Sequence, residues 1–172
     1  MGTYRHDYPQ VKAATVKQWK AIREDVERLL SNLPTNSESA GGTFSHLTLA
    51  LANGTGKPGT IPIVTDGEIA LNGLEGIHDL SHESLWLTRA KNKVENADFC
   101  RTARKPYDLV VCAVLIVLQH QAPDVWQITT DGSFEDWEPA REWVEAVLDY
   151  PGFNELGEIC KEQLATAVEA TA

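Results

Sequence analysis

Four residues within one short segment carry side chains that bind divalent metals: His78, Asp79, His82 and Glu83. Histidines four positions apart share one face of a helix, and nearly so of a strand, so both imidazoles can reach one ion. A carboxylate from Glu83 or Asp66 would complete a site that activates water for hydrolysis. The pattern differs from the HExxH pattern of zinc peptidases, and two nearby glycines disfavour a helix. A polar loop is the alternative interpretation.

A second set of residues suggests anion binding. Six of the fifteen Lys and Arg residues fall within seventeen positions: Arg89, Lys91, Lys93, Arg101, Arg104 and Lys105. We predict that Arg89, Arg101, Arg104 and Lys105 bind phosphate, a nucleotide or a nucleic-acid backbone, aided by the N-terminus of the helix that follows. The alternative is a solvated face that pairs internally with the C-terminal third, where Arg141 and Lys161 stand against thirteen acidic residues.

Nucleophilic chemistry has weaker support. Cys112 lies within an apolar segment and is expected to pack as a small apolar side chain. Cys100 is close to two arginines, which would lower its pKa if the thiol were exposed, but a buried structural thiol is the alternative. The glycine-rich segment 53–60 does not match a phosphate-binding loop, because Pro58 follows its only Gly-Lys pair.

Length and composition place the chain among globular proteins with one domain. The net charge is −10 and the isoelectric point about 4.9, which disfavours non-specific binding to nucleic acid. Three cysteines without a CxxC pair indicate a reducing, cytoplasmic setting. The polar N-terminus is unlike a signal peptide, and the longest apolar run, 109–118, is about half of what a bilayer crossing needs.

The elements that must position these residues follow from hydrophobic periodicity. Apolar residues three and four apart predict an N-terminal helix over 9–33, followed by a linker at 35–42. Alternating residues and turn signals then predict a β-meander over 44–88. Its strands are expected at 44–52, 61–65, 68–72 and 84–88, with a hairpin turn at Asp66-Gly67.

The remainder is predicted as helix, strand, helix and helix over 106–168. The polar and basic segment 89–105 carries no clear periodicity, and 96–103 within it is compatible with a short helix. Tyr107–Gln121 is predicted as a helix that is apolar nearly all round and therefore central. A strand at 125–130 and helices at 137–150, capped by Ser133 or Asp136, and at about 153–168 complete the chain. The fold class is α+β: one domain, 1–172, with a small, mostly antiparallel sheet packed by an N-terminal helix, the central helix and two C-terminal helices.

The segment from Phe99 to Arg141 resembles one family of small proteins. Its FCRTARKPYD sequence at Phe99–Asp108, apolar helix, Asp131-Gly132 turn and Trp137 are similar to those of orphan proteins encoded by tailed bacterial and archaeal viruses. In that family serines are more usual than Thr129-Thr130. The resemblance covers about a quarter of the chain. It implies a viral or proviral origin and implies nothing about catalysis.

Two functions are compatible with these patterns. The first is a non-enzymatic, virus-encoded accessory protein of the host cytoplasm that needs no cofactor and binds an anionic ligand, a protein partner or a second copy of itself. Trp137 and Trp143 lie on different helix faces, so one of them is a candidate for an exposed partner surface. The alternative is a small metal-dependent hydrolase or nucleotide-binding enzyme that uses His78, His82 and Glu83.

Overall fold

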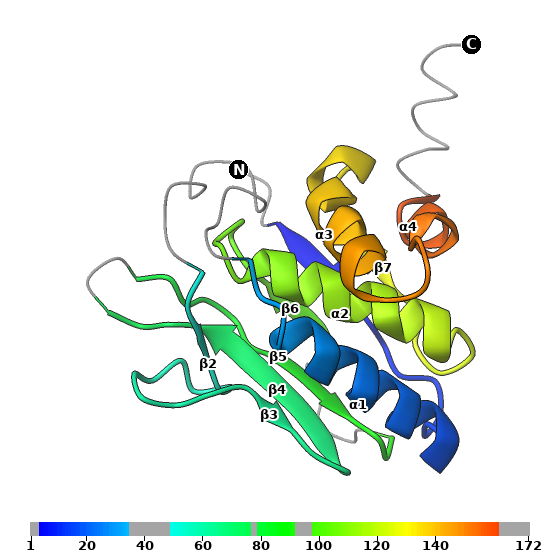
Figure 1. Ribbon diagram of the computed structural model, residues 1–172, viewed down its shortest axis with the longest axis horizontal. Coiled ribbons are helices and arrows are strands. Elements are labelled where there is room, and N and C mark those ends of the chain that lie inside the picture. Colours follow the sequence, from blue (N-terminus) through cyan, green and yellow to red (C-terminus); the bar gives the residue numbers. More distant parts are fainter. Residues whose placement is uncertain (1–3, 35–48, 77–78, 92–97, 162–172) are drawn as a thin grey trace.

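The computed structural model describes residues 4–34, 49–76, 79–91 and 98–161, which form helices and antiparallel strands (Figure 1). The elements are β1 Arg5–Asp7, α1 Val16–Leu30, β2 Leu51–Ala52, β3 Ile63–Val64, β4 Glu68–Gly73, β5 Leu85–Thr88, β6 Phe99–Arg101, α2 Asp108–Gln121, β7 Thr129–Thr130, α3 Phe134–Val147 and α4 Phe153–Ile159. The expected α+β class is confirmed. The predicted linker at 35–42, the start of the meander at 44–48 and the end of the last helix at 162–168 lie outside the described residues.

The described strands form two antiparallel sheets where one was expected. In the larger sheet, β4 is central and pairs with β2, β3 and β5. The β3–β4 hairpin turns at Asp66-Gly67, as predicted. In the smaller sheet the order is β6-β1-β7, so strands from three distant parts of the chain lie side by side.

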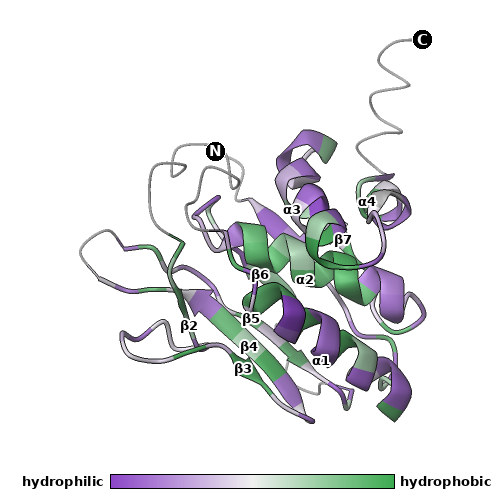
Figure 2. Ribbon diagram, in the orientation of Figure 1, coloured by the Kyte–Doolittle hydropathy of each residue, from purple (hydrophilic) through white to green (hydrophobic). Residues whose placement is uncertain are grey.

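Helix α2 forms the centre of the hydrophobic core, as its sequence predicted. Every residue from Leu109 to Leu118 is buried, and the helix contacts α1, α3 and α4. Figure 2 shows it as hydrophobic along most of its length, whereas α1 and α3 carry hydrophilic outer faces. No described helix has both the length and the apolar character needed to cross a membrane.

Helix α1 is shorter than the predicted range 9–33. It starts at Val16 because Thr15 caps it: the Thr15 hydroxyl accepts from the Gln18 amide, and the Gln18 side chain accepts from the Thr15 amide. The residues before the cap are extended, and Gln10 forms an isolated bridge with Trp126. The spacing of the apolar residues therefore predicted the helix correctly but predicted its start too early.

Helix α3 begins earlier than predicted, at Phe134. Ser133 is its N-cap: its hydroxyl accepts from the Asp136 amide, and the Asp136 carboxylate accepts from the Ser133 amide, so both candidate caps act together. Its two tryptophans, Trp137 and Trp143, are 0% and 8% exposed, so the expectation that one of them marks an exposed surface is wrong.

Segment 96–103 does not form the expected helix where it is described: Phe99–Arg101 is β6. Strand β1, which pairs with it, was not predicted at all. After β6, Ala103 and Arg104 adopt left-handed backbone conformations with φ of 52° and 56°. These two residues turn the chain sharply before α2 begins.

Gly73, at the end of β4, is a stringent test of this packing. An added Cβ would lie 1.8 Å from the Leu80 carbonyl oxygen and 2.9 Å from the Tyr107 ring, whereas a Cβ on Gly67 would meet nothing within 4 Å. We expect Gly73→Ala to lower the free energy of unfolding by at least about 2 kcal/mol, and Gly67→Ala to change it by less than about 0.5 kcal/mol. Urea denaturation measures both. Equal stabilities of the two variants would contradict the register of β4 against residues 79–85.

Candidate functional site

The predicted anion-binding residues do not gather at one place. Arg104 is the second residue of the left-handed turn, and its side chain reaches α3. There its guanidinium pairs with Asp136 and lies 4.1 Å from the centre of the Tyr4 ring. Burial disfavours ionisation of Asp136, but hydrogen bonds from Arg104 and Ser133 hold its pKa below the usual range. Arg104 is therefore engaged within the fold.

Lys105 and Arg89 lie in two further places. The Lys105 ammonium donates to the carbonyl oxygens of Asp79 and Ser81, at 2.7 and 2.6 Å, and its side chain is largely buried. Arg89 lines a pocket of about 380 Å³ beside α1, together with Val16, Trp19, Lys20, Arg23 and Asp66. The sequence cluster therefore separates in space.

Two of the predicted metal ligands contact Arg101. The His82 Nδ1 atom lies 2.7 Å from the Arg101 carbonyl oxygen. The Glu83 carboxylate accepts from the Arg101 amide at 2.8 Å and from its guanidinium at 3.0 Å. Among the described residues, neither His82 nor Glu83 belongs to a group of three possible ligands, and His78 lies outside them. The metal interpretation of this segment stays a prediction.

Arg101 itself lies on the outer face of the β6-β1-β7 sheet. Because side chains alternate along a strand, odd-numbered residues of the three strands point to the same side. These residues are Arg5, Asp7, Phe99, Arg101 and Thr129, and all are partly exposed. We call this surface the outer sheet face.

The outer sheet face forms an open pocket of about 530 Å³, extended by Pro9, Asp98 and Gln127. The guanidinium carbons of Arg5 and Arg101 lie 3.9 and 4.9 Å from the centre of the Phe99 ring. Two cations thus share one aromatic side chain, an arrangement that cation–π attraction stabilises.

Carboxylates balance these cations in part. Arg5 donates through Nε to Asp7 at 2.8 Å, and Arg101 pairs with Glu83. The Nε atom of Arg101 is buried, and no described residue accepts a hydrogen bond from it. Burial raises the pKa of Asp98, while Lys91 lowers it. The pocket is therefore lined by two guanidinium groups and by a carboxyl group whose pKa burial raises.

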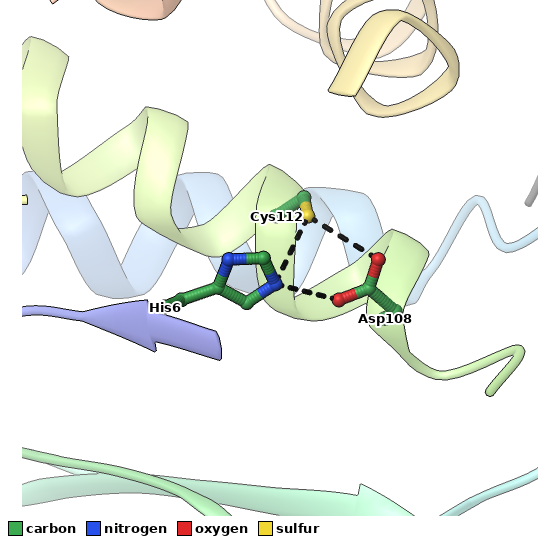
Figure 3. Close-up of side chains that lie close together, drawn as sticks. All are labelled: His6, Asp108 and Cys112. Atoms are coloured by element: carbon green, nitrogen blue, oxygen red, sulfur yellow. Dashed lines mark hydrogen bonds and ion pairs between the residues drawn. The ribbon is translucent and has the colours of Figure 1, made fainter. Parts of the chain in front are cut away.

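The inner face of the same sheet carries a buried polar cluster of His6, Asp108 and Cys112 (Figure 3). His6 Nε2 lies 2.7 Å from Asp108 Oδ1 and 3.7 Å from Cys112 Sγ, and the thiol lies 3.6 Å from Asp108 Oδ2. His6 and Cys112 are 0% and 1% exposed. A strand and the first turns of α2 thus bring together three groups able to hold a metal.

Two threonines and two aromatic rings surround the cluster. Thr130 Oγ1 lies 2.8 Å from His6 Nδ1, and the Thr102 hydroxyl donates to Asp108 Oδ1 at 2.7 Å. Tyr4 and Trp137 pack edge-to-face on the imidazole, with ring centres 4.8 and 5.0 Å away. Every surface of His6 is therefore covered by protein.

This arrangement does not suit nucleophilic catalysis. A catalytic thiol and its orienting carboxylate contact opposite nitrogens of a histidine, whereas Cys112 and Asp108 both face Nε2. Burial, followed by the charge of Asp108, raises the pKa of the Cys112 thiol well above its usual value. A buried, protonated thiol is a poor nucleophile.

Two features of the chain correspond to this cluster: the alternation of residues 4–10 and the spacing of Asp108 and Cys112. Residues 4–10 alternate strictly between buried and more exposed positions, with Tyr4, His6 and Tyr8 facing inward. Asp108 and Cys112 are four apart and therefore share one face of α2. What joins His6 to that face is strand pairing across about a hundred residues, which no local pattern specifies.

No protein-family model matches the chain, and the searches of curated proteins and of solved structures found no match.

The three cysteines provide a direct check on the burial described here. All three are free and buried. Burial raises the pKa of each thiol, that of Cys160 to about 11. We expect none of them to react with a thiol reagent such as Ellman's reagent at neutral pH in the folded protein, and all three to react in denaturant. Rapid reaction of Cys112 in the native state would contradict the buried cluster.

Proposed function

We propose that the protein is a virus-encoded accessory protein that binds a phosphate-bearing ligand on the outer sheet face. The observation that carries the proposal is the placement of the Arg5 and Arg101 guanidinium groups over Phe99 in one open pocket. The proposed activity is binding, since the residues of this pocket that distinguish it are two cations beside one aromatic ring.

The chemistry of the pocket favours phosphate over other anions. A guanidinium presents donors in a planar fork that matches two phosphate oxygens. Phe99 supplies an apolar ring on which a base can stack when the ligand is a nucleotide or a single strand. Thr129 adds a hydroxyl at the rim of the same pocket. Binding here needs no basic surface elsewhere, which accords with a net charge of −10.

Origin and location form part of the same proposal. The resemblance of Phe99–Arg141 to viral orphan proteins supports a viral origin. Three free, buried cysteines support residence in the reducing cytoplasm of the host. The ligand class includes inorganic phosphate, nucleotides and nucleic-acid backbones, and a phosphorylated protein partner would present the same group.

Arg101 and Arg104 make a matched pair for testing the site. Each guanidinium pairs with one carboxylate and lies over one aromatic ring, Phe99 for Arg101 and Tyr4 for Arg104. We expect Arg101→Gln to weaken phosphate binding about tenfold, the effect of losing a charge-assisted hydrogen bond, and Arg104→Gln to leave it unchanged. Calorimetric titration with inorganic phosphate, ADP and a short single-stranded oligonucleotide distinguishes the ligand sources. Loss of binding in Arg104→Gln alone would overturn the assignment.

The pH dependence of binding tests the role of Asp98. Because its pKa is raised, this carboxyl loses its negative charge at a higher pH than an ordinary aspartate, while Arg5 and Arg101 stay charged. We expect the affinity for sulfate, which keeps its charge across this range, to rise as pH falls through that pKa. Asp98→Asn should bind more tightly at neutral pH and show a flatter profile. If the dependence of sulfate affinity on pH were the same in Asp98→Asn as in the unmodified protein, the anion would bind away from Asp98. Asp7→Asn removes a different carboxylate from the same pocket and serves as the comparison.

A further inference from the structure

We infer that His6, Asp108 and Cys112 form a structural site for a divalent metal of the zinc type. The inference concerns the inner face of the sheet and is independent of the anion site. It assigns imidazole, carboxylate and thiolate ligands to one ion, a combination that zinc accepts in proteins. The three ligand atoms already lie within 4.8 Å of one another without any rearrangement of the backbone.

The distances between the ligand atoms fit tetrahedral zinc. Bond lengths of about 2.3 Å to sulfur and about 2.0–2.1 Å to nitrogen or oxygen place the sulfur about 3.5 Å from each neighbouring ligand atom. The observed separations of Cys112 Sγ are 3.7 Å from His6 Nε2 and 3.6 Å from Asp108 Oδ2. Coordination through Oδ2 leaves Oδ1 to accept from Thr102. An ion bound to His6 Nε2 would replace the 2.7 Å hydrogen bond between this nitrogen and Asp108 Oδ1.

The residues around the ligands are those that a metal site requires. A metal-bound histidine donates its other ring N–H to a fixed acceptor, and His6 Nδ1 faces Thr130 Oγ1 at 2.8 Å. A metal-bound carboxylate is held by a hydrogen bond to its second oxygen, which is the role of Thr102. Both ligands are therefore oriented before the ion binds.

Unpartnered buried groups point to the same place. Four buried side-chain polar atoms lack a hydrogen-bond partner in the described structure, and two of them belong to the rings packed on His6: Tyr4 Oη and Trp137 Nε1. Tyr4 is only 6% exposed. Its hydroxyl lies close enough to Cys112 to lower the pKa of the thiol, against the larger effect of burial. The Tyr4 hydroxyl is therefore a buried polar group beside the proposed ligands without a hydrogen-bond partner of its own in the described structure.

The proton balance of metal binding is explicit. The ion would displace two protons: the thiol proton of Cys112, which leaves to solvent, and the Nε2 proton that His6 shares with Asp108, which is replaced by one at Nδ1 so that the bound imidazole is neutral. One thiolate and one carboxylate then neutralise the two positive charges of the ion. Burial and the Asp108 charge disfavour a thiolate without the ion, so the ion's own charge must reverse that preference. Affinity should therefore fall as pH is lowered. Because His6 lies on β1 and the other two ligands lie on α2, an ion here would tie the strand to the helix.

Cobalt substitution tests the inference, since Co²⁺ occupies zinc sites and gives a thiolate charge-transfer band. The full chain is unfolded under reducing conditions, stripped with a chelator and refolded with and without Co²⁺ or Zn²⁺. We expect one equivalent of bound metal per chain, a raised melting temperature and the thiolate band. Cys112→Ser should abolish the band, whereas Cys100→Ser and Cys160→Ser, which alter equally buried thiols, should keep it.

A second variant keeps the test decisive if Cys112→Ser fails to fold. Thr130→Val removes the partner of His6 Nδ1 and leaves all three ligands in place. We expect it to keep the thiolate band and to bind Zn²⁺ about 10–100-fold more weakly. Refolded protein that holds no stoichiometric metal, or a cobalt spectrum that survives loss of Cys112, would show that the cluster is a polar network without an ion.

Discussion

The hydrogen bond between His6 and Asp108 is the contact on which the arrangement of the molecule depends. It joins the central strand of the smaller sheet to the first turn of the central helix, at 2.7 Å, and its His6 side is fully buried. Around it, Thr130 and Thr102 bring β7 and the segment after β6 to the same point. A buried polar group left without a partner costs about 1–3 kcal/mol, so each member of this network requires the others. The network therefore fixes the position of β1 relative to α2.

Strand β1 then determines both faces of the smaller sheet. Its even-numbered residues enter the core, where His6 meets α2, and its odd-numbered residues, Arg5 and Asp7, reach the outer sheet face. A one-residue slip in register would exchange the two sets and would bury Arg5. The proposed anion site and the cluster of His6, Asp108 and Cys112 thus both follow from the same alternation.

The sequence predicted those parts of the fold that depend on local signals. The all-apolar helix at Tyr107–Gln121, the cap at Ser133 and the hairpin at Asp66-Gly67 are each specified within a few residues, and the structure has all three. Strand β1 was missed because its hydrogen-bonding partners, β6 and β7, lie about a hundred residues away. The predicted anion-binding cluster was dispersed in the structure for a similar reason, because the local sequence does not specify where the side chains go. Arg101, Arg104 and Lys105 are near neighbours in sequence, but a strand and then two left-handed residues send their side chains in different directions.

The central claim is that the outer sheet face, and no other basic part of the chain, receives the anion. The most direct measurement is a map of backbone amide chemical shifts during titration with inorganic phosphate. The amides of β1, β6 and β7 at the outer sheet face should shift together and saturate with one dissociation constant. Shifts centred on Arg104, on Lys105 or on the pocket beside Arg89, with β1 and β6 unaffected, would contradict the assignment.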